Sequence, residues 1–202
     1  VRFGGGRWVE KPAPSVSGAV DGVQVYSGPM TASQAPERAH PAHWALDEGR
    51  GPTAADSSGA GRTATLGSAA TWTTGQVGSH ALSLNGTSSA TAVASGPAVD
   101  TSQGFSASAW VKLNNTSGYQ SVLSIDGSRI SGFYLQLSGA THKFAFTRRA
   151  SDSTTATEVR ADADSQPSTG TWYHLIGVDD VVAKQLRLYV NGQLQSTVSY
   201  TT

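Results

Sequence analysis

The sequence predicts an all-β protein, an antiparallel sandwich of two sheets, and three observations favour this fold class. Apolar and polar residues alternate with period two in several segments, as in strands that bury one face. Clusters of Gly, Ser, Asn and Asp separate these segments at the spacing typical of sandwiches. No segment shows convincing helical periodicity, because prolines interrupt residues 31–42, the one candidate for a short helical turn.

The strongest strand prediction covers residues 105–113, where the odd-numbered positions are all apolar and Ser106, Ser108 and Lys112 lie between them. Trp110 interrupts the alternation. We expect it under a loop on the outer face, with an exposed aromatic as the alternative. Similar patterns predict further strands over residues 119–125, 133–137, 143–147 and 186–190.

The clearest turn is the pair Asn191-Gly192, which follows the strand pattern of residues 186–190 and precedes Gln193-Leu194. A two-residue type I′ turn needs positive φ at both central positions, and Asn-Gly is a pair that accepts it. The sequence therefore predicts a β-hairpin at this position.

Charge is sparse and balanced: Asp, Glu, Lys and Arg make up 14% of the chain, with 14 basic and 14 acidic side chains. Arg148-Arg149 is the densest cationic spot. Binding driven by counterion release needs a patch or stripe of basic side chains, and the sequence shows none. Neither nucleic acid nor an anionic membrane surface is therefore an expected partner. No apolar run approaches the ~20 residues that span a bilayer, so membrane insertion is not expected either.

Cysteine is absent, which excludes disulfides, thiolate catalysis and cysteine-based zinc sites. Surfaces rich in Ser and Thr and poor in Lys are common in extracellular β-proteins, and we expect a secreted or cell-surface location. The chain begins at Val1 and not at Met, so we expect a processed or excised piece of a protein.

Six short motifs occur in a characteristic order along residues 43–200. They are His43-Trp44-Ala45-Leu46-Asp47-Glu48-Gly49, Asp56-Ser57-Ser58-Gly59, Gly78-Ser79-His80-Ala81-Leu82-Ser83-Leu84-Asn85-Gly86, Phe105-Ser106-Ala107-Ser108-Ala109-Trp110-Val111, Thr171-Trp172-Tyr173-His174-Leu175 and Leu188-Tyr189-Val190-Asn191-Gly192. Together they resemble the laminin-G-like branch of the concanavalin A-like lectin/glucanase jelly rolls. The resemblance implies two large antiparallel sheets, one concave and one convex, stacked face to face.

The order of the last strands departs from that family. Its closing strands should follow Tyr200, yet similar sequence appears at the N-terminus, as Val1-Arg2-Phe3-Gly4-Gly5 and as residues 17–28. We therefore divide the chain into a closing-strand segment, residues 1–37, with a linker to residue 42, and a laminin-G-like jelly-roll body, residues 43–202.

Three alternatives remain open for residues 1–37. The segment could complete its own sandwich as a permuted domain, with residues 19–26 paired to residues 43–47. It could instead be the end of a preceding repeat, or it could fill the gap in a neighbouring molecule. A body without these strands would expose unpaired backbone groups, which invite strand addition.

Catalysis is not expected. The glucanases of the superfamily carry a Glu-x-Asp-x-x-Glu pattern on one strand, and this sequence has none; the acidic residues 158–164 read as a solvated strand end. No Gly-x-Ser-x-Gly elbow occurs, and the five His are dispersed without zinc-ligand spacing.

Calcium is the cofactor that the resemblance implies, bound structurally by carboxylates near the sandwich edge. The implied ligands are Asp21, Asp47 and Asp56, provided that the N-terminal strand pairs with the first strand of the body. The alternative is that Asp21 caps a strand end and that Asp56 makes an Asx-turn with the residues after it.

Ligand-binding candidates are Tyr119, Arg129, Tyr134, Arg148 and Arg149, which lie on or beside strands where the family builds its concave face and rim. Sugar recognition needs exposed aromatic rings together with polar groups that fix orientation. The alternative is that the two Tyr pack inward and the three Arg are ordinary surface charges.

The function expected from these observations is a non-catalytic module that binds carbohydrate, with a glycan or glycoprotein as partner. The alternative is a structural or adhesive repeat, or a fibre subunit, that joins other copies of itself by strand complementation.

Overall fold

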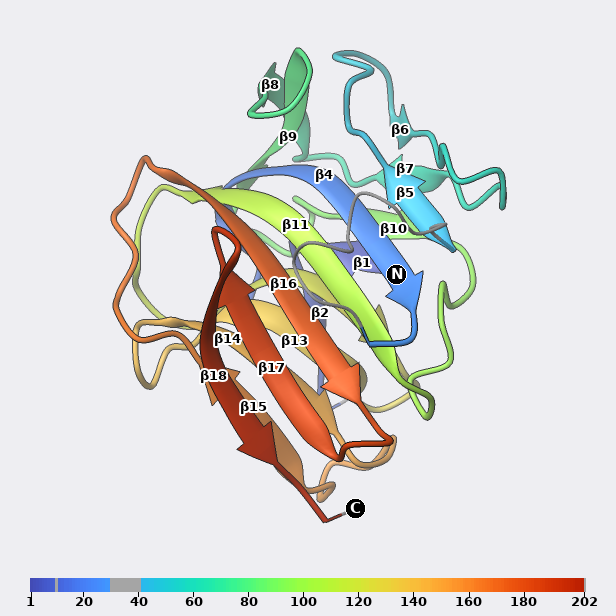
Figure 1. Ribbon diagram of the computed structural model, residues 1–202. Helices are drawn as coiled ribbons and strands as arrows, with labels where there is room; N and C mark the ends of the chain where they lie inside the picture. Colours follow the sequence, from blue (N-terminus) through green and yellow to red (C-terminus); the bar gives the residue numbers. More distant parts are fainter. Residues whose placement is uncertain (10, 30–40, 202) are drawn as a thin grey trace.

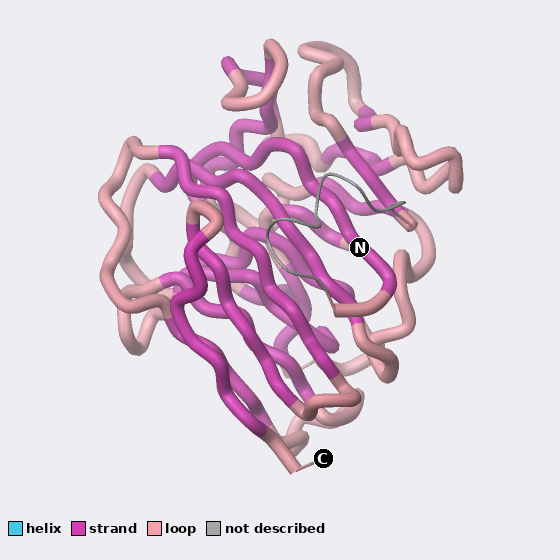
Figure 2. Tube along the Cα trace, in the orientation of Figure 1, coloured by secondary structure: helices cyan, strands magenta, loops and turns pink. Residues whose placement is uncertain are grey.

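The computed structural model describes residues 1–9, 11–29 and 41–201, and these residues form strands and loops without a helix. Figures 1 and 2 show two stacked layers of antiparallel strands, which we name the front sheet and the back sheet after their places in Figure 1. The predicted all-β sandwich is confirmed. The described residues include no helix of the length and apolarity that a membrane span requires.

The front sheet holds the longest strands, and β5 (Ala42–Trp44) is attached to β4 beside its main path. Its order is β18 (Gln193–Ser199), β17 (Gln185–Val190), β16 (Trp172–Asp180), β11 (Phe105–Leu113), β4 (Ser17–Ser27), β9 (His80–Asn85) and β8 (Thr71–Thr74).

The back sheet combines four regular strands with four very short ones. Its order is β15 (Glu158–Asp162), β14 (Phe144–Arg149), β13 (Ser131–Leu137), β12 (Gln120–Asp126), β1 (Arg2–Phe3), β10 (Ala92–Ala94), β7 (Ala64–Leu66) and β6 (Thr53–Ala54). A small hairpin of β2 (Gly6–Trp8) and β3 (Lys11–Ala13) pairs only with itself and contacts β12 and β13.

The strand predictions are confirmed to within a few residues. The segment 105–113 forms β11, and the other four segments fall on β12, β13, β14 and β17. Asn191 and Gly192 have φ of +50° and +79°, as the predicted type I′ turn requires. Trp110 is half-buried, and its ring stacks on His174 of β16 with 5.0 Å between centroids.

The core lies between the sheets and is dominated by aromatic rings. Phe105 of the front sheet packs against Phe133 and Phe146 of the back sheet, with centroids 5.0 and 6.0 Å apart. Gly177 permits this contact, because a Cβ at that position would lie 2.3 Å from Phe146. Such interdigitation is what the period-two pattern predicts for the inner faces of a sandwich.

The N-terminal segment supplies a strand to the interior of each sheet. β1 lies between β10 and β12, and β4 lies between β11 and β9 while also pairing with β5 in the register Val23↔Trp44. Gly18 is needed where β4 meets β11, since a Cβ there would lie 2.0 Å from the Lys112 carbonyl oxygen. Residues 30–40, which include the end of the closing-strand segment and most of the linker to residue 42, fall outside the described residues.

Candidate functional site

A pocket of about 280 Å³ lies on the outer face of the back sheet, opposite the core. Strands β12, β13 and β14 form its floor, and the β2–β3 hairpin forms one side. The residues that line it are Trp8, Ala13, Pro14, Tyr119, Ser121, Tyr134, Gln136, Thr147, Arg149 and Glu158.

The register of the paired strands places the residues of the pocket floor side by side. Ser121 pairs with Gln136 across β12 and β13, and Tyr134 pairs with Thr147 across β13 and β14. The Gln136 Nε2 atom donates a 3.0 Å hydrogen bond to the Thr147 hydroxyl. Because side chains alternate along a strand, their neighbours Phe133, Leu135 and Phe146 point the other way into the core.

One wall of the pocket is the indole of Trp8, which is 45% exposed. Its ring lies 6.4 Å from that of Tyr134, and the Arg149 guanidinium sits over it at 4.5 Å. The Tyr134 hydroxyl donates a hydrogen bond to the Arg7 carbonyl, and the Arg7 amide donates to Ser131 Oγ at 2.8 Å. These contacts attach the hairpin to the sheet.

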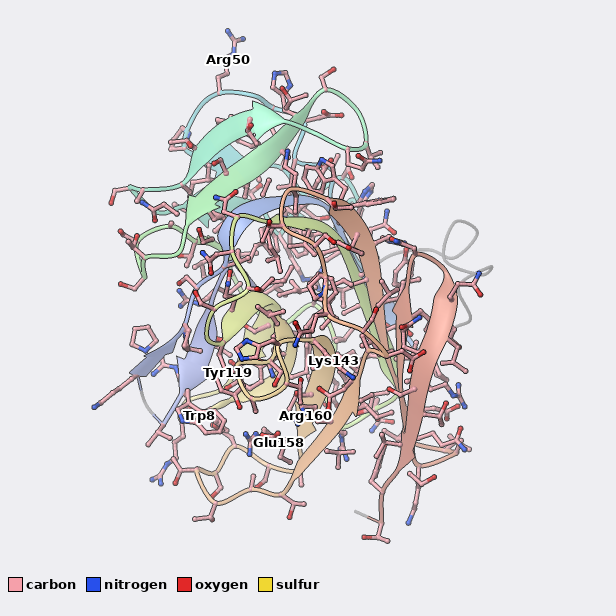
Figure 3. The ribbon with its side chains drawn as sticks, turned by 90° about the vertical axis from the view of Figure 1, so that its left-hand side faces the viewer. Trp8, Arg50, Tyr119, Lys143, Glu158 and Arg160 are labelled. Atoms are coloured by element: carbon pink, nitrogen blue, oxygen red, sulfur yellow. The ribbon has the colours of Figure 1, made fainter. Side chains whose placement is uncertain are left out.

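The other wall is Tyr119, which is 43% exposed and precedes β12. Its ring crowds Gly139, just beyond the end of β13, where a Cβ would lie 2.7 Å away. Trp8 lies beside Tyr134, and Tyr134 is five residues before Gly139 in the sequence. The rings of Trp8 and Tyr119 therefore lie toward opposite ends of the floor. Figure 3 shows Trp8, Tyr119 and Glu158 gathered on one face of the molecule.

The charges beside the pocket are balanced. Arg149 forms an ion pair with Glu158 and also donates from Nη1 to the Ala156 carbonyl at 3.2 Å. Arg160 pairs with Glu158 at 3.8 Å and with Asp162 at 3.1 Å. The buried Nε of Arg149 has no acceptor among the described residues. Burial raises the pKa of Tyr134, so this phenol is a neutral hydrogen-bond donor.

The structure brings Tyr119, Tyr134 and Arg149 together at the pocket, and it places the other two ligand candidates elsewhere. Arg148 does not line the pocket: consecutive strand residues face opposite sides, and Arg148 points into the sandwich, where it pairs with Asp179 at 2.9 Å. Arg129 does not line the pocket; its amide donates to Asp152 Oδ1 at 2.9 Å.

Sequence reasoning missed four functional candidates: Trp8, Gln136, Thr147 and Glu158. The two-residue period would have found Gln136 and Thr147, because they share a face with Tyr134 and Arg149. The sequence pattern indicates a solvated strand end for Glu158, whereas the structure places Glu158 at the pocket. Nothing in the local pattern marks Trp8, since its hairpin meets the sheet only through tertiary contacts.

The three predicted calcium ligands do not converge, and no group of three or more His, Cys, Asp or Glu in the described ranges could hold a metal. Asp56 organises its own loop, accepting amide hydrogen bonds from His43, Ser58 and Arg62 at 3.0–3.1 Å. The bond from Ser58 closes the Asx-turn given as the alternative. The carboxylate of Asp56 therefore has the hydrogen bonds of a loop-organising residue.

Asp21 and Asp47 remain as a pair beside the turn between β8 and β9. Asp21 Oδ2 accepts the amides of Gln76 and Val77, and Asp47 Oδ1 accepts those of Ser79 and His80. Burial raises the pKa of Asp21, and the charge of Asp47 adds to the rise. Asp21 Oδ1 is buried without a donor among the described residues. An orphaned carboxylate oxygen near a second carboxylate fits a hard cation.

A two-sheet antiparallel jelly roll with a partly apolar, aromatic-walled pocket on one outer face is the architecture of a binding module. A laminin-G-type family model, described as the Concanavalin A-like lectin/glucanases superfamily, matches residues 84–202, more than half of the chain. The chain belongs to this family. Searches among curated proteins and among solved structures found no match.

Proposed function

We propose that the chain is a carbohydrate-binding module of a secreted or cell-surface protein, and that the pocket on the back sheet is its binding site. The observation that carries the proposal is a pair of half-exposed aromatic rings, Trp8 and Tyr119, at opposite ends of a polar floor. Aromatic faces stack on the apolar faces of sugar rings, while Gln136, whose Nε2 is bonded to Thr147, keeps its side-chain oxygen as an acceptor that fixes orientation.

The proposed role is binding without catalysis. Glycoside hydrolysis by the common mechanisms needs two carboxyl groups on either side of the scissile bond. Glu158 is the one carboxylate among the described pocket-lining residues, and it is engaged by Arg149 and Arg160. Chromogenic aryl glycosides incubated with the chain should therefore release no product above the rate in buffer.

A glycan array tests the proposed binding. Wild-type chain should retain a defined set of glycans, and Trp8→Ala and Tyr119→Ala should each weaken binding about 5- to 30-fold, because stacking on one aromatic contributes about 1–2 kcal/mol. Leu194→Ala is the matched control, since Leu194 is 51% exposed on β18 and does not line the pocket. Glycan binding that survives both aromatic substitutions would assign the site elsewhere.

Calcium is proposed as a structural ion held by Asp21 and Asp47, where it would offset the burial of the Asp21 carboxylate and the nearby negative charge of Asp47, which both raise the pKa of Asp21. Added CaCl₂ should raise the melting temperature of the wild-type chain relative to EDTA, because an ion that binds only the folded state stabilises it. Asp47→Asn should abolish the increase while Asp56→Asn retains it. Equal melting temperatures in CaCl₂ and EDTA would contradict the proposal.

A structural or adhesive role through strand complementation is the second candidate. It is supported by the positions of β1 and β4, which occupy the interior of both sheets yet come from one terminal segment. In this role, chains refolded at high concentration should form dimers that exchange residues 1–29. Two full-length preparations with different labels, unfolded and refolded together, should then give mixed dimers by size-exclusion chromatography. Monomers at every concentration would exclude this role.

A further inference from the structure

We propose that the pocket selects a single uncharged sugar ring and disfavours the corresponding uronic acid. This inference rests on the proposed carbohydrate-binding function and adds the ligand class to it. It is derived from the charges, the hydrogen-bonding groups and the size of the pocket.

The electrostatic argument begins with Arg149, the one cation that lines the pocket among the described residues. Its side chain is only 7% exposed, and its charge is already compensated by Glu158. A sugar carboxylate placed beside Arg149 would also approach Glu158, and like charges in a partly desolvated site repel. An anionic ring would therefore gain little from Arg149.

The neighbouring charges do not change this balance. Arg160 is shared between Glu158 and Asp162, so the four side chains Arg149, Arg160, Glu158 and Asp162 carry no net charge. The whole chain is also neutral, with 14 basic and 14 acidic residues. No surplus positive potential directs an anion toward the pocket.

Hydrogen-bonding groups on the pocket suit a neutral hydroxylated ring. Arg149 Nε is buried without an acceptor among the described residues, so a ligand in the pocket does not reach it. Gln136 Nε2 donates to Thr147, and this leaves the Gln136 side-chain oxygen to accept from a ligand. A sugar hydroxyl can donate to that oxygen, whereas a carboxylate only accepts.

The size and shape of the pocket favour one ring. Its volume of about 280 Å³ is at the lower end of ligand sites, which span ~300–1,000 Å³. Trp8 and Tyr119 both line this one volume.

The test compares two matched pairs of ligands by saturation-transfer NMR titration of the wild-type chain: methyl glucoside with methyl glucuronide, and methyl galactoside with methyl galacturonide. The members of each pair differ in the group at C6, so a difference in affinity reports the carboxylate. The neutral member of at least one pair should bind at least tenfold more tightly than its acid.

Glu158→Gln tests the cause. Removing the carboxylate leaves Arg149 uncompensated, so the preference for the neutral ring should fall at least fivefold. Asp162→Asn is the matched control: it also removes an acid paired with Arg160, but Asp162 does not line the pocket, and the preference should persist. Circular dichroism and thermal melting check that both variants are folded.

The outcomes separate this inference from the proposed function. If no neutral or acidic ligand binds and the glycan array is also blank, the proposed function fails. If neutral and acidic members bind within threefold of each other, glycan binding stands and the selectivity is overturned. The wild-type comparison decides this even if Glu158→Gln does not fold.

Discussion

At the scale of single residues, the adjacent arginines 148 and 149 show how strand alternation assigns roles. Arg149 lines the pocket, whereas Arg148 crosses the sandwich to Asp179, with 2.9 Å between Nε and Oδ2 as an ion pair that lacks the alignment of a hydrogen bond. The Tyr200 hydroxyl donates to Asp179 Oδ1 at 2.5 Å, and the Tyr200 ring lies 4.4 Å from the Arg148 guanidinium. Burial raises the pKa of Asp179.

Arg148→Met should lower the free energy of unfolding by about 3–5 kcal/mol, because it leaves the buried Asp179 without its cation. Adding Asp179→Asn should recover most of the loss, since a neutral amide needs no counter-charge and can still accept from Tyr200. Urea unfolding of the single and double variants measures both effects. A double variant as unstable as Arg148→Met alone would show that packing, and not charge, explains the loss.

The ionised carboxylate of Asp56 predicts how the stability of the fold depends on pH. Burial acts to raise its pKa, but hydrogen bonds from Ser58, His43 and Arg62 outweigh burial and lower the pKa to about 2 from 3.8. A depressed pKa means that the ionised carboxylate stabilises the fold above pH 3.8, and that this stabilisation is lost as pH falls toward 2. Asp56→Ala should cost ~2 kcal/mol at neutral pH, and the difference from wild type should shrink through that window in urea unfolding.

At the scale of elements, the long strands follow from local sequence because their alternation spans many residues. The type I′ turn between β17 and β18 is equally local: Gly192 has φ of +79° and nothing within 4 Å of where a Cβ would lie. Gly192→Ala should therefore cost about 1–2 kcal/mol through backbone strain alone, measured by thermal or urea unfolding. Gln193→Ala, at an exposed position of the same hairpin, is the control and should change stability by less than ~0.5 kcal/mol.

Other elements could not be predicted from local sequence. Strands β1, β2, β3, β6 and β7 contain two or three residues each, too few to show a period. The pocket combines Trp8 with Tyr119 and Glu158, which are far apart in the sequence. Sheet register brings Tyr119 and Glu158 to one face, and tertiary contacts of the β2–β3 hairpin add Trp8. Tyr119, Tyr134 and Arg149, three of the ten lining residues, were therefore accessible to pattern reasoning, and the hairpin wall was not.

At the scale of the whole molecule, residues 1–29 contribute to both sheets, the core and the pocket at once. Phe3, Val20, Val23 and Val25 are fully buried in the common core, and Trp8, Ala13 and Pro14 line the pocket. Since burying one such core side chain contributes ~1.5–3 kcal/mol, the four together contribute on the order of 10 kcal/mol. That is comparable to the total stability of a typical domain, about 5–15 kcal/mol.

Deleting residues 1–29 should therefore abolish cooperative unfolding, because the gaps between β10 and β12 and between β9 and β11 would open both sheets. A synthetic peptide of residues 1–29, added to the remainder, should restore a single sigmoidal urea transition at one peptide per chain, since strand pairing supplies the same ladders in trans. A peptide with Gly18→Val is the control: its side chain would collide with the Lys112 carbonyl, so it should not restore the transition. A truncated chain that melts cooperatively at the wild-type temperature would show that the sandwich is complete without these strands.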